Sequence, residues 1–168
     1  PPRSTLFPYT TLFRSPAITA LKKAKVPYRL HAYQHDAGAA SYGGEAAQKL
    51  AIEPARVFKT LVVETDGQKF VIGIVPVAHQ LDLKLLAQAL GTKKAAMAQA
   101  QDAEKMTGYV LGGISPLGQK RKLATVIDAS ATGFTTIFVS AGRRGLEIEL
   151  APHDLCALTH GTFAEISR

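Results

Sequence analysis

An Asp-Gly pair between two apolar runs constrains the fold more than any other feature of this sequence. Residues 56–64 and 69–77 are rich in Val, Ile, Leu and Phe, and Asp66-Gly67 lies between them. Both residues of such a pair can adopt the positive φ angles that a two-residue turn between antiparallel strands requires. The sequence therefore predicts a β-hairpin here, closed by a two-residue turn.

The rest of the chain alternates between helical and extended patterns. Apolar spacing and capping residues, such as Ser15 before Pro16, predict helices near residues 16–24, 45–50, 81–90, 99–106 and from 152 onward. Further strands are predicted at residues 28–35, 124–128, 135–140 and 146–150, with a second hairpin at 141–145. In the last strand we expect one buried face and an opposite face shared by Glu147 and Glu149. These elements predict an α+β fold with a mixed, partly antiparallel sheet.

Composition limits the class of protein. A chain of 168 residues that is 46% hydrophobic forms one domain with a core of its own. Its longest apolar runs, such as residues 70–78, are far shorter than the about 20 residues that a membrane-spanning helix needs. Cys156 is the only cysteine, which excludes an intrachain disulfide and fits a reducing, cytoplasmic setting. The net charge of +7 suggests an anionic partner, although the basic residues are dispersed in small clusters.

The first fifteen residues differ from the rest. Residues 1–15 show no helical period, no sustained alternation and no apolar core of a signal peptide. Residues 5–15 resemble the in-frame translation of a widely used sequencing-adapter oligonucleotide. We therefore expect residues 1–15 to be a non-native tail and residues 16–168 to form the domain.

Lys59 is the unusual residue of the first predicted hairpin, because its neighbours at 57–63 are otherwise almost all apolar. An ammonium group is costly to bury there without a partner. Two interpretations remain open. The lysine either reaches water at a strand edge, or holds its charge at a pocket mouth, where it binds phosphate or polarises an ester carbonyl.

The glycine-rich segment 108–118 is too irregular for a helix or strand. Its Gly112 and Gly113 offer adjacent backbone N–H groups that a ligand can approach closely. Gly113 and Gly118 have the spacing of a P-loop, but Gln119 stands where a lysine is required, which excludes nucleoside triphosphate binding of that kind. On the residues alone, an ordinary tight loop explains the segment equally well.

No combination of residues indicates a metal site or a protein nucleophile. His31 and His35 would lie about 13 Å apart on one strand, too far to share a metal ion. The other histidines have no carboxylate or cysteine at a ligand spacing, and Ser115 has no evident His and Asp partners. We therefore expect no metal, no cofactor and no nucleophilic hydrolase, with Cys156 in the core.

Several motifs, in one order along the chain, resemble the YbaK family of bacterial Cys-tRNA(Pro)/Cys-tRNA(Cys) deacylases, homologous to the editing insertion domain of prolyl-tRNA synthetase. The resemblance extends from Pro16 to the C-terminus. The motifs are HAYQHD (31–36), VFKTL (57–61), PVAHQLDLKLLAQALG (76–91), TGYVLGGISPLGQK (107–120) and FVSAGRRGLEIEL (138–150).

The resemblance implies a single α+β domain with a mixed, barrel-like β-sheet, surrounding helices and a pocket. Lys59 matches the functional lysine of the family. Tyr42 and Glu147 replace what are often phenylalanine and aspartate, so the pocket size is expected to differ. The substrate-binding residues implied are Tyr33, Tyr42, Gly112, Gly113, Ser115, Ser140 and Glu147.

The resemblance also implies a mechanism and partners. The thiol of the mischarged cysteine attacks its own ester carbonyl, so the protein supplies positioning and charge stabilisation rather than a nucleophile. The implied partners are the aminoacyl-tRNA acceptor end and prolyl-tRNA synthetase. Two alternatives remain: a related deacylase for tRNA mischarged with Ala, Ser or Thr, and a non-catalytic module that binds tRNA or a synthetase.

Overall fold

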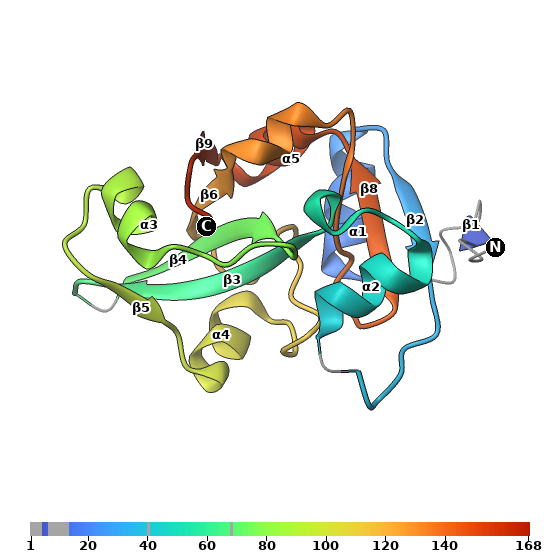
Figure 1. The fold of residues 1–168 in the computed structure, drawn as a ribbon, viewed down its shortest axis with the longest axis horizontal. Helices are drawn as coiled ribbons and strands as arrows, with labels where there is room; N and C mark the ends of the chain where they lie inside the picture. The colour runs from blue at the N-terminus through green and yellow to red at the C-terminus, as the bar shows by residue number, and fades with distance from the viewer. Residues whose placement is uncertain (1–4, 7–13, 40, 68) are drawn as a thin grey trace.

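Two β-sheets, with helices packed around them, form the fold of the protein (Figure 1). The structure, a computed structural model, describes residues 5–6, 14–39, 41–67 and 69–168. One sheet has four strands in the order β1-β2-β8-β7, and the other has five in the order β5-β3-β4-β6-β9. The sheets include antiparallel and parallel pairs and are not closed into a barrel. The predicted α+β class with mixed sheets is confirmed.

The five-stranded sheet is built on the predicted hairpin. Strands β3 (Phe58–Thr65) and β4 (Lys69–Pro76) pair antiparallel along their whole length. Thr65 pairs with Lys69, so three residues separate the strands and the predicted two-residue turn is wrong. Gly67 has a φ of 75°, a conformation that glycine adopts without steric strain. Three more strands complete the sheet: β5 (Ala95–Met97), β6 (Ala124–Asp128) and β9 (Thr162–Ala164).

The four-stranded sheet comes from both ends of the chain. Strands β7 (Ile137–Ser140) and β8 (Leu146–Leu150) form the second predicted hairpin. Strand β2 (Arg29–Ala32) pairs with β8, and β1 (Thr5–Leu6) pairs with β2. A parallel bridge between Val57 and Phe138 connects the two sheets immediately before β3. This bridge brings the start of β3 next to β7.

Five α-helices surround the sheets: α1 (Pro16–Ala24), α2 (Tyr42–Leu50), α3 (Leu83–Leu90), α4 (Ala100–Thr107) and α5 (Pro152–Thr159). Ser15 caps α1 as predicted, by accepting a hydrogen bond from the backbone N–H of Ile18 at 3.2 Å. Helix α2 begins earlier than predicted, because Ser41 is its N-cap and places Gly43 inside the first turn. A Cβ at Gly43 would overlap the side chain of Val77, so this glycine lets α2 approach the end of β4.

The largest core cluster joins both sheets to helix α1. Ile18, Leu21, Phe58, Ile72 and Ile148 belong to it, and each is at most 2% exposed. No helix in the described part of the chain is long and apolar enough to cross a membrane.

The second face of β8 is covered as well, contrary to the prediction of one buried face. Glu147 is only 7% exposed, although its neighbours Leu146 and Ile148 fill the core on the opposite face. Cys156 packs against the core but is only partly buried. Of the predicted non-native tail, only Thr5, Leu6, Arg14 and Ser15 are among the described residues. Its foreign origin stays a prediction.

Candidate functional site

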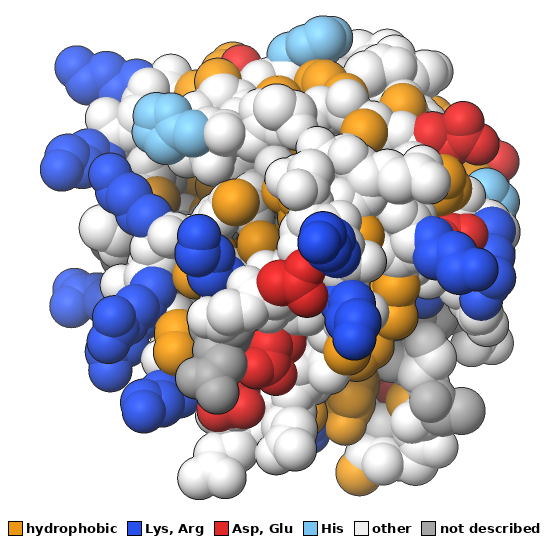
Figure 2. All heavy atoms as spheres, turned by 90° about the vertical axis from the view of Figure 1, so that its left-hand side faces the viewer, with side chains coloured by type: hydrophobic (Ala, Val, Ile, Leu, Met, Phe, Trp, Pro, Cys, Tyr) orange, Lys and Arg blue, Asp and Glu red, His pale blue; other side chains and the backbone are white. Residues whose placement is uncertain are grey.

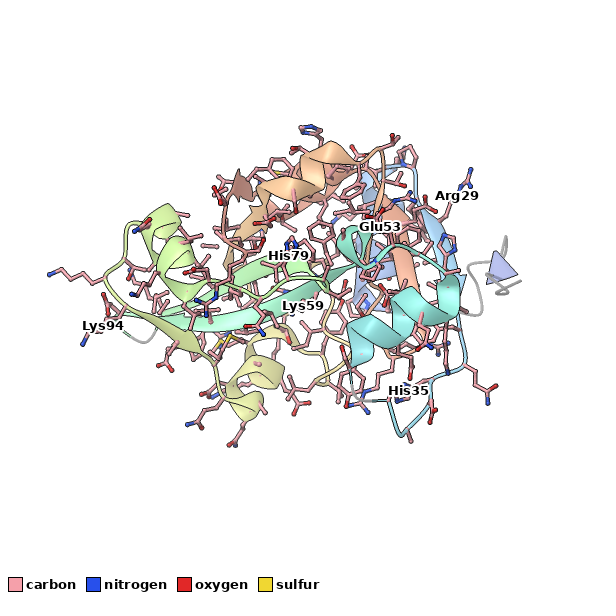
Figure 3. All side chains as sticks on the ribbon, viewed as in Figure 1. Arg29, His35, Glu53, Lys59, His79 and Lys94 are labelled. Atoms are coloured by element: carbon pink, nitrogen blue, oxygen red, sulfur yellow. The ribbon has the colours of Figure 1, made fainter. Side chains whose placement is uncertain are left out.

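A cavity of about 420 Å³ lies where β3, the start of α2, the glycine-rich segment and the β7–β8 hairpin meet. Five of the residues singled out in the sequence line it: Tyr42, Lys59, Gly112, Ser140 and Glu147. They come from five different elements, and Figure 3 shows Lys59 near the middle of the molecule, beside α2. The fold thus gathers these side chains around one space.

Lys59 is half-buried on the wall of this cavity. Burial lowers the pKa of its ammonium group. Among the described residues none forms an ion pair or hydrogen bond with it. A half-buried cation that has no protein partner among the described residues is suited to an anionic or strongly polarised ligand group.

Glu147 contributes a carboxyl group to the same cavity. Burial raises its pKa to about 8, because the charged form loses hydration. Ser140 lies directly opposite on β7, and its Oγ accepts a hydrogen bond from the backbone N–H of Gly142 at 3.2 Å. Because burial raises its pKa to about 8, the Glu147 carboxyl is mostly protonated at pH 7 in the absence of a ligand.

Gly112 allows Tyr42 and Arg144 to pack closely against the glycine-rich segment. Its φ is 86°, and a Cβ there would lie 2.6 Å from both Arg144 Nε and Tyr42 Cε2. Gly113 donates its N–H to the carbonyl of Val110 at 2.9 Å, so this group is used within the loop. The N–H of Gly112 has no acceptor in the described part of the chain. Of the two amides singled out in the sequence, only that of Gly112 remains open to a ligand.

Arg144 contacts two residues of the cavity lining and was not among the residues predicted for the site. Its Cζ lies 4.3 Å from the centroid of the Tyr42 ring, and its Nη2 donates to the carbonyl of Leu111 at 2.7 Å. The guanidinium thereby connects the β7–β8 loop to α2 and to the glycine-rich segment. The position of two arginines in a hairpin loop was the only signal for this role in the sequence.

Three other residues singled out in the sequence lie outside the cavity lining. Ser115 is fully buried, and its Oγ accepts a hydrogen bond from the N–H of Leu117 at 3.2 Å. Gly113 lies against the backbone of Arg143. Tyr33 packs on a small apolar cluster behind the cavity, and burial, followed by the charge of Glu147, raises the pKa of its phenol to about 12.

A polar network around Glu149 on β8 lies outside the lining of the Lys59 cavity. His31 Nε2 contacts Glu149 Oε1 at 2.8 Å, and Thr136 Oγ1 donates to Glu149 Oε2 at 2.6 Å. Arg56 contacts the same carboxylate at 3.3 Å and lies over the ring of Phe138. Burial acts to raise the pKa of Glu149, but the hydrogen bonds and the charges of His31 and Arg56 outweigh it and leave the pKa lowered. Sequence alone gave no signal for this network.

No cluster of three or more His, Cys, Asp or Glu side chains suited to a metal ion occurs in the described ranges. His31 and His35 bind separate carboxylates, those of Glu149 and Glu45, each at 2.8 Å.

Comparison with known proteins identifies the family of this chain. Residues 37–158 match the model of the aminoacyl-tRNA editing domain. EbsC of Enterococcus faecalis, named as a candidate Cys-tRNA(Pro)/Cys-tRNA(Cys) deacylase, is 41% identical over 90% of this chain and 92% of its own length. The chain belongs to the aminoacyl-tRNA editing domain family. Membership confirms the class of enzyme that the motifs predict, an aminoacyl-tRNA deacylase.

Solved structures of the same fold exist. A structure described as a candidate trans-editing enzyme for prolyl-tRNA synthetase has a TM-score of 0.77 at 22% identity, over 91% of this chain and 95% of that one. The hypothetical protein APE2540 has a TM-score of 0.82 at 22% identity, over 92% of this chain and 100% of that one. At this identity they establish the fold of the editing domain.

Proposed function

We propose that this editing domain hydrolyses Cys-tRNA(Pro) with the help of the substrate's own thiol. The observation that carries the proposal is a cavity in which, among the described residues, the ammonium of Lys59 and the N–H of Gly112 have no protein partner and no cysteine or histidine belongs to the lining. Such a cavity can bind and polarise an ester but has no evident protein nucleophile and base. The name of the similar protein EbsC supports the choice of cysteine as the acyl group.

In the proposed reaction the cysteine sulfur attacks its own carbonyl carbon. A carbon–sulfur bond forms, the bond from the carbonyl carbon to the 3′-oxygen of the tRNA breaks, and the thiol proton passes to that oxygen. Water later opens the cyclic thioester to free cysteine. The step needs no oxidant or external nucleophile.

Lys59 and Gly112 stabilise negative charge during this step. The ammonium of Lys59 faces the oxygen on which charge develops, and no described residue pairs with this ammonium in competition with the substrate. The N–H of Gly112 donates a hydrogen bond from the opposite wall. Both groups are held by the fold before the substrate arrives, so little reorganisation opposes the reaction.

Glu147 orients the acyl group. Its carboxylate is the acidic group in the lining, and it suits the α-ammonium of an aminoacyl ester. Because its pKa without ligand is about 8, binding of a cation at neutral pH favours loss of its proton. Selection of tRNA is assigned to a synthetase partner, prolyl-tRNA synthetase.

The test is a deacylation panel with Cys-, Ala-, Ser- and Pro-tRNA(Pro). We expect rapid release of tRNA from the cysteinyl substrate and at least a hundredfold slower release by Lys59→Ala. Lys94→Ala is the control, because Lys94 lies at the far end of the molecule in Figure 3. Equal rates for the wild type and Lys59→Ala would refute the role of the lysine. Comparable hydrolysis of the alanyl ester would refute thiol assistance, since alanine has no thiol.

A further inference from the structure

Basic side chains are unevenly distributed over the protein surface. Figure 2 shows that Lys and Arg side chains are most numerous along the left margin of one face. In the sequence, residues 14–35 and 105–127 contain nine Lys or Arg residues and no Asp or Glu. These two segments meet in space, because both contribute to one large hollow.

This basic hollow has a volume of about 690 Å³ and is separate from the cavity of Lys59. It is formed by the end of α1, residues 116–119, residues 121–125 and the end of α5 at 158–160. Lys23, Arg121, Lys122 and His160 lie in its lining, and none of the described lining residues is acidic. The two openings have no lining residue in common.

We propose that the basic hollow binds phosphates of the acceptor stem of the tRNA, as a second contact outside the catalytic cavity. The inference rests on the proposed function, because it takes tRNA as the substrate. The single-stranded 3′-end of a tRNA can enter a cavity while the adjoining duplex remains outside, so a duplex-binding surface has to lie on another part of the protein.

The glycine-rich segment connects the two places. Gly112 lines the cavity, and Pro116, four residues later, lines the hollow. Four residues of extended chain span at most about 14 Å. One RNA molecule can therefore contact both sites without a change in the fold.

Residues 118–121, which lie at the basic hollow, are held in position by contacts with two helices. The backbone N–H groups of Lys120 and Arg121 donate to the carbonyls of Thr107 and Met106 at the end of α4, at 2.9 and 3.1 Å. Gly118 passes so close to Pro16 that a Cβ would overlap the backbone there. A charged surface that is already ordered loses less conformational entropy when it binds a ligand.

A purely structural role explains only part of this charge. Lys22 and Lys23 lie in the last turn of α1, where positive charge stabilises a helix terminus. Arg121 and Lys122 belong to no helix and form no ion pair with a described acidic residue. Both are exposed, so their charge is available to an external anion.

The experiment measures binding of uncharged tRNA by fluorescence anisotropy at several salt concentrations. The variant is Arg121→Glu/Lys122→Glu, and the matched control is Lys93→Glu/Lys94→Glu, an exposed adjacent pair at the far end of the molecule. We expect the first pair to raise the Kd at least tenfold and to lower the slope of log K against log salt by about 2, since each phosphate contact contributes about 0.9. Arg121→Gln/Lys122→Gln should weaken binding by a smaller factor.

Deacylation kinetics supply a second readout. The Arg121→Glu/Lys122→Glu variant should raise the KM for full-length aminoacyl-tRNA with little change in kcat. It should leave hydrolysis of a 3′-aminoacyl adenosine unchanged. An unchanged Kd, or equal effects of both charge-reversed pairs, would overturn the proposal. Unchanged tRNA binding with loss of synthetase binding would assign the hollow to a protein partner instead, and would also overturn it. Because uncharged tRNA is used, absence of deacylase activity would count against the proposed function and not against the hollow.

Discussion

The guanidinium of Arg144 lies over the ring of Tyr42, with its Cζ 4.3 Å from the ring centroid, and binds the carbonyl of Leu111. This contact holds three chain segments together at the mouth of the cavity. A cation–π contact at such an exposed site contributes about 0.5–1 kcal/mol and a charged hydrogen bond about 1.5–3 kcal/mol.

We expect Arg144→Ala to raise the KM for aminoacyl-tRNA about tenfold. Arg144→Lys should recover only part of the loss, because lysine keeps the charge but not the planar group. Steady-state kinetics with the two variants check this, and full recovery by lysine would contradict it.

Gly112→Ala should inactivate the enzyme more than its backbone strain explains. A φ of 86° costs a non-glycine residue about 1–2 kcal/mol, and the new methyl group would also displace Tyr42 and Arg144. Gly67→Ala is the matched control, because Gly67 has a φ of 75° and no atom within 4 Å of the added Cβ. We expect Gly112→Ala to lose at least as much thermal stability as Gly67→Ala, and only Gly112→Ala to lower kcat/KM at least tenfold. Equal activities would show that the close approach at Gly112 is unimportant.

Glu147 should make the protein less stable as the pH rises. Its folded-state pKa of about 8 lies above the unfolded value of 4.5, so the folded state holds a proton that the unfolded state loses in between. Its contribution is fully present below about pH 4.5 and is lost as the pH rises to about 8. We expect Glu147→Gln to reduce this loss by roughly 3–5 kcal/mol, from about 1.4 kcal/mol per pKa unit. Urea unfolding at pH 5 and pH 8.5 measures the difference, and parallel curves for both proteins would refute the shift.

Glu149, two residues further along β8, should act in the opposite direction. Its folded-state pKa is lowered, so its contribution to stability is present above the unfolded value and is lost as the pH falls through the folded value. Glu149→Gln should therefore destabilise the protein at pH 7, and this destabilisation should be smaller at pH 3. Thermal unfolding at the two pH values tests this. A loss at pH 3 as large as that at pH 7 would point to packing rather than charge.

Ser15→Ala should destabilise the domain by about 1–2 kcal/mol. The hydroxyl caps α1 and also donates to the carbonyl of Ala141 at 2.6 Å, so it connects the helix to the end of β7. Ser15→Gly, which leaves the cap position acceptable but removes the link, should cost less than alanine. Chemical denaturation ranks the three proteins, and an unchanged midpoint for Ser15→Ala would exclude both contacts.

Local pattern was enough to locate most elements of this fold. The strands at 124–128 and 146–150 have the predicted bounds, because alternation and turn residues are local signals. Strands β5 and β9, of three residues each, were missed because so few residues carry no periodicity. The covered second face of β8 was missed for a different reason. Alternation shows that Glu147 and Glu149 share a face but not whether another segment packs on it.

For the cavity too, local sequence features were predictable and contacts between distant segments were not. Lys59 stood out because a charge in an apolar strand is a local anomaly. Gly112, Ser140 and Glu147 lie within the quoted motifs, and Tyr42 was named only through the family resemblance. The partnership of Arg144 with Tyr42 depends on a contact between segments distant in sequence, which no window of residues contains. The polar network around Glu149 was invisible for the same reason.

The two sheets divide the cavity residues between them: Lys59 belongs to the five-stranded sheet, and Ser140 and Glu147 to the four-stranded one. The cavity therefore comes into existence only when the sheets dock through Val57 and Phe138. Because one core cluster joins both sheets, we expect the sheets and the cavity to be lost together on unfolding. Catalysis is then a reporter of the contact between the two sheets.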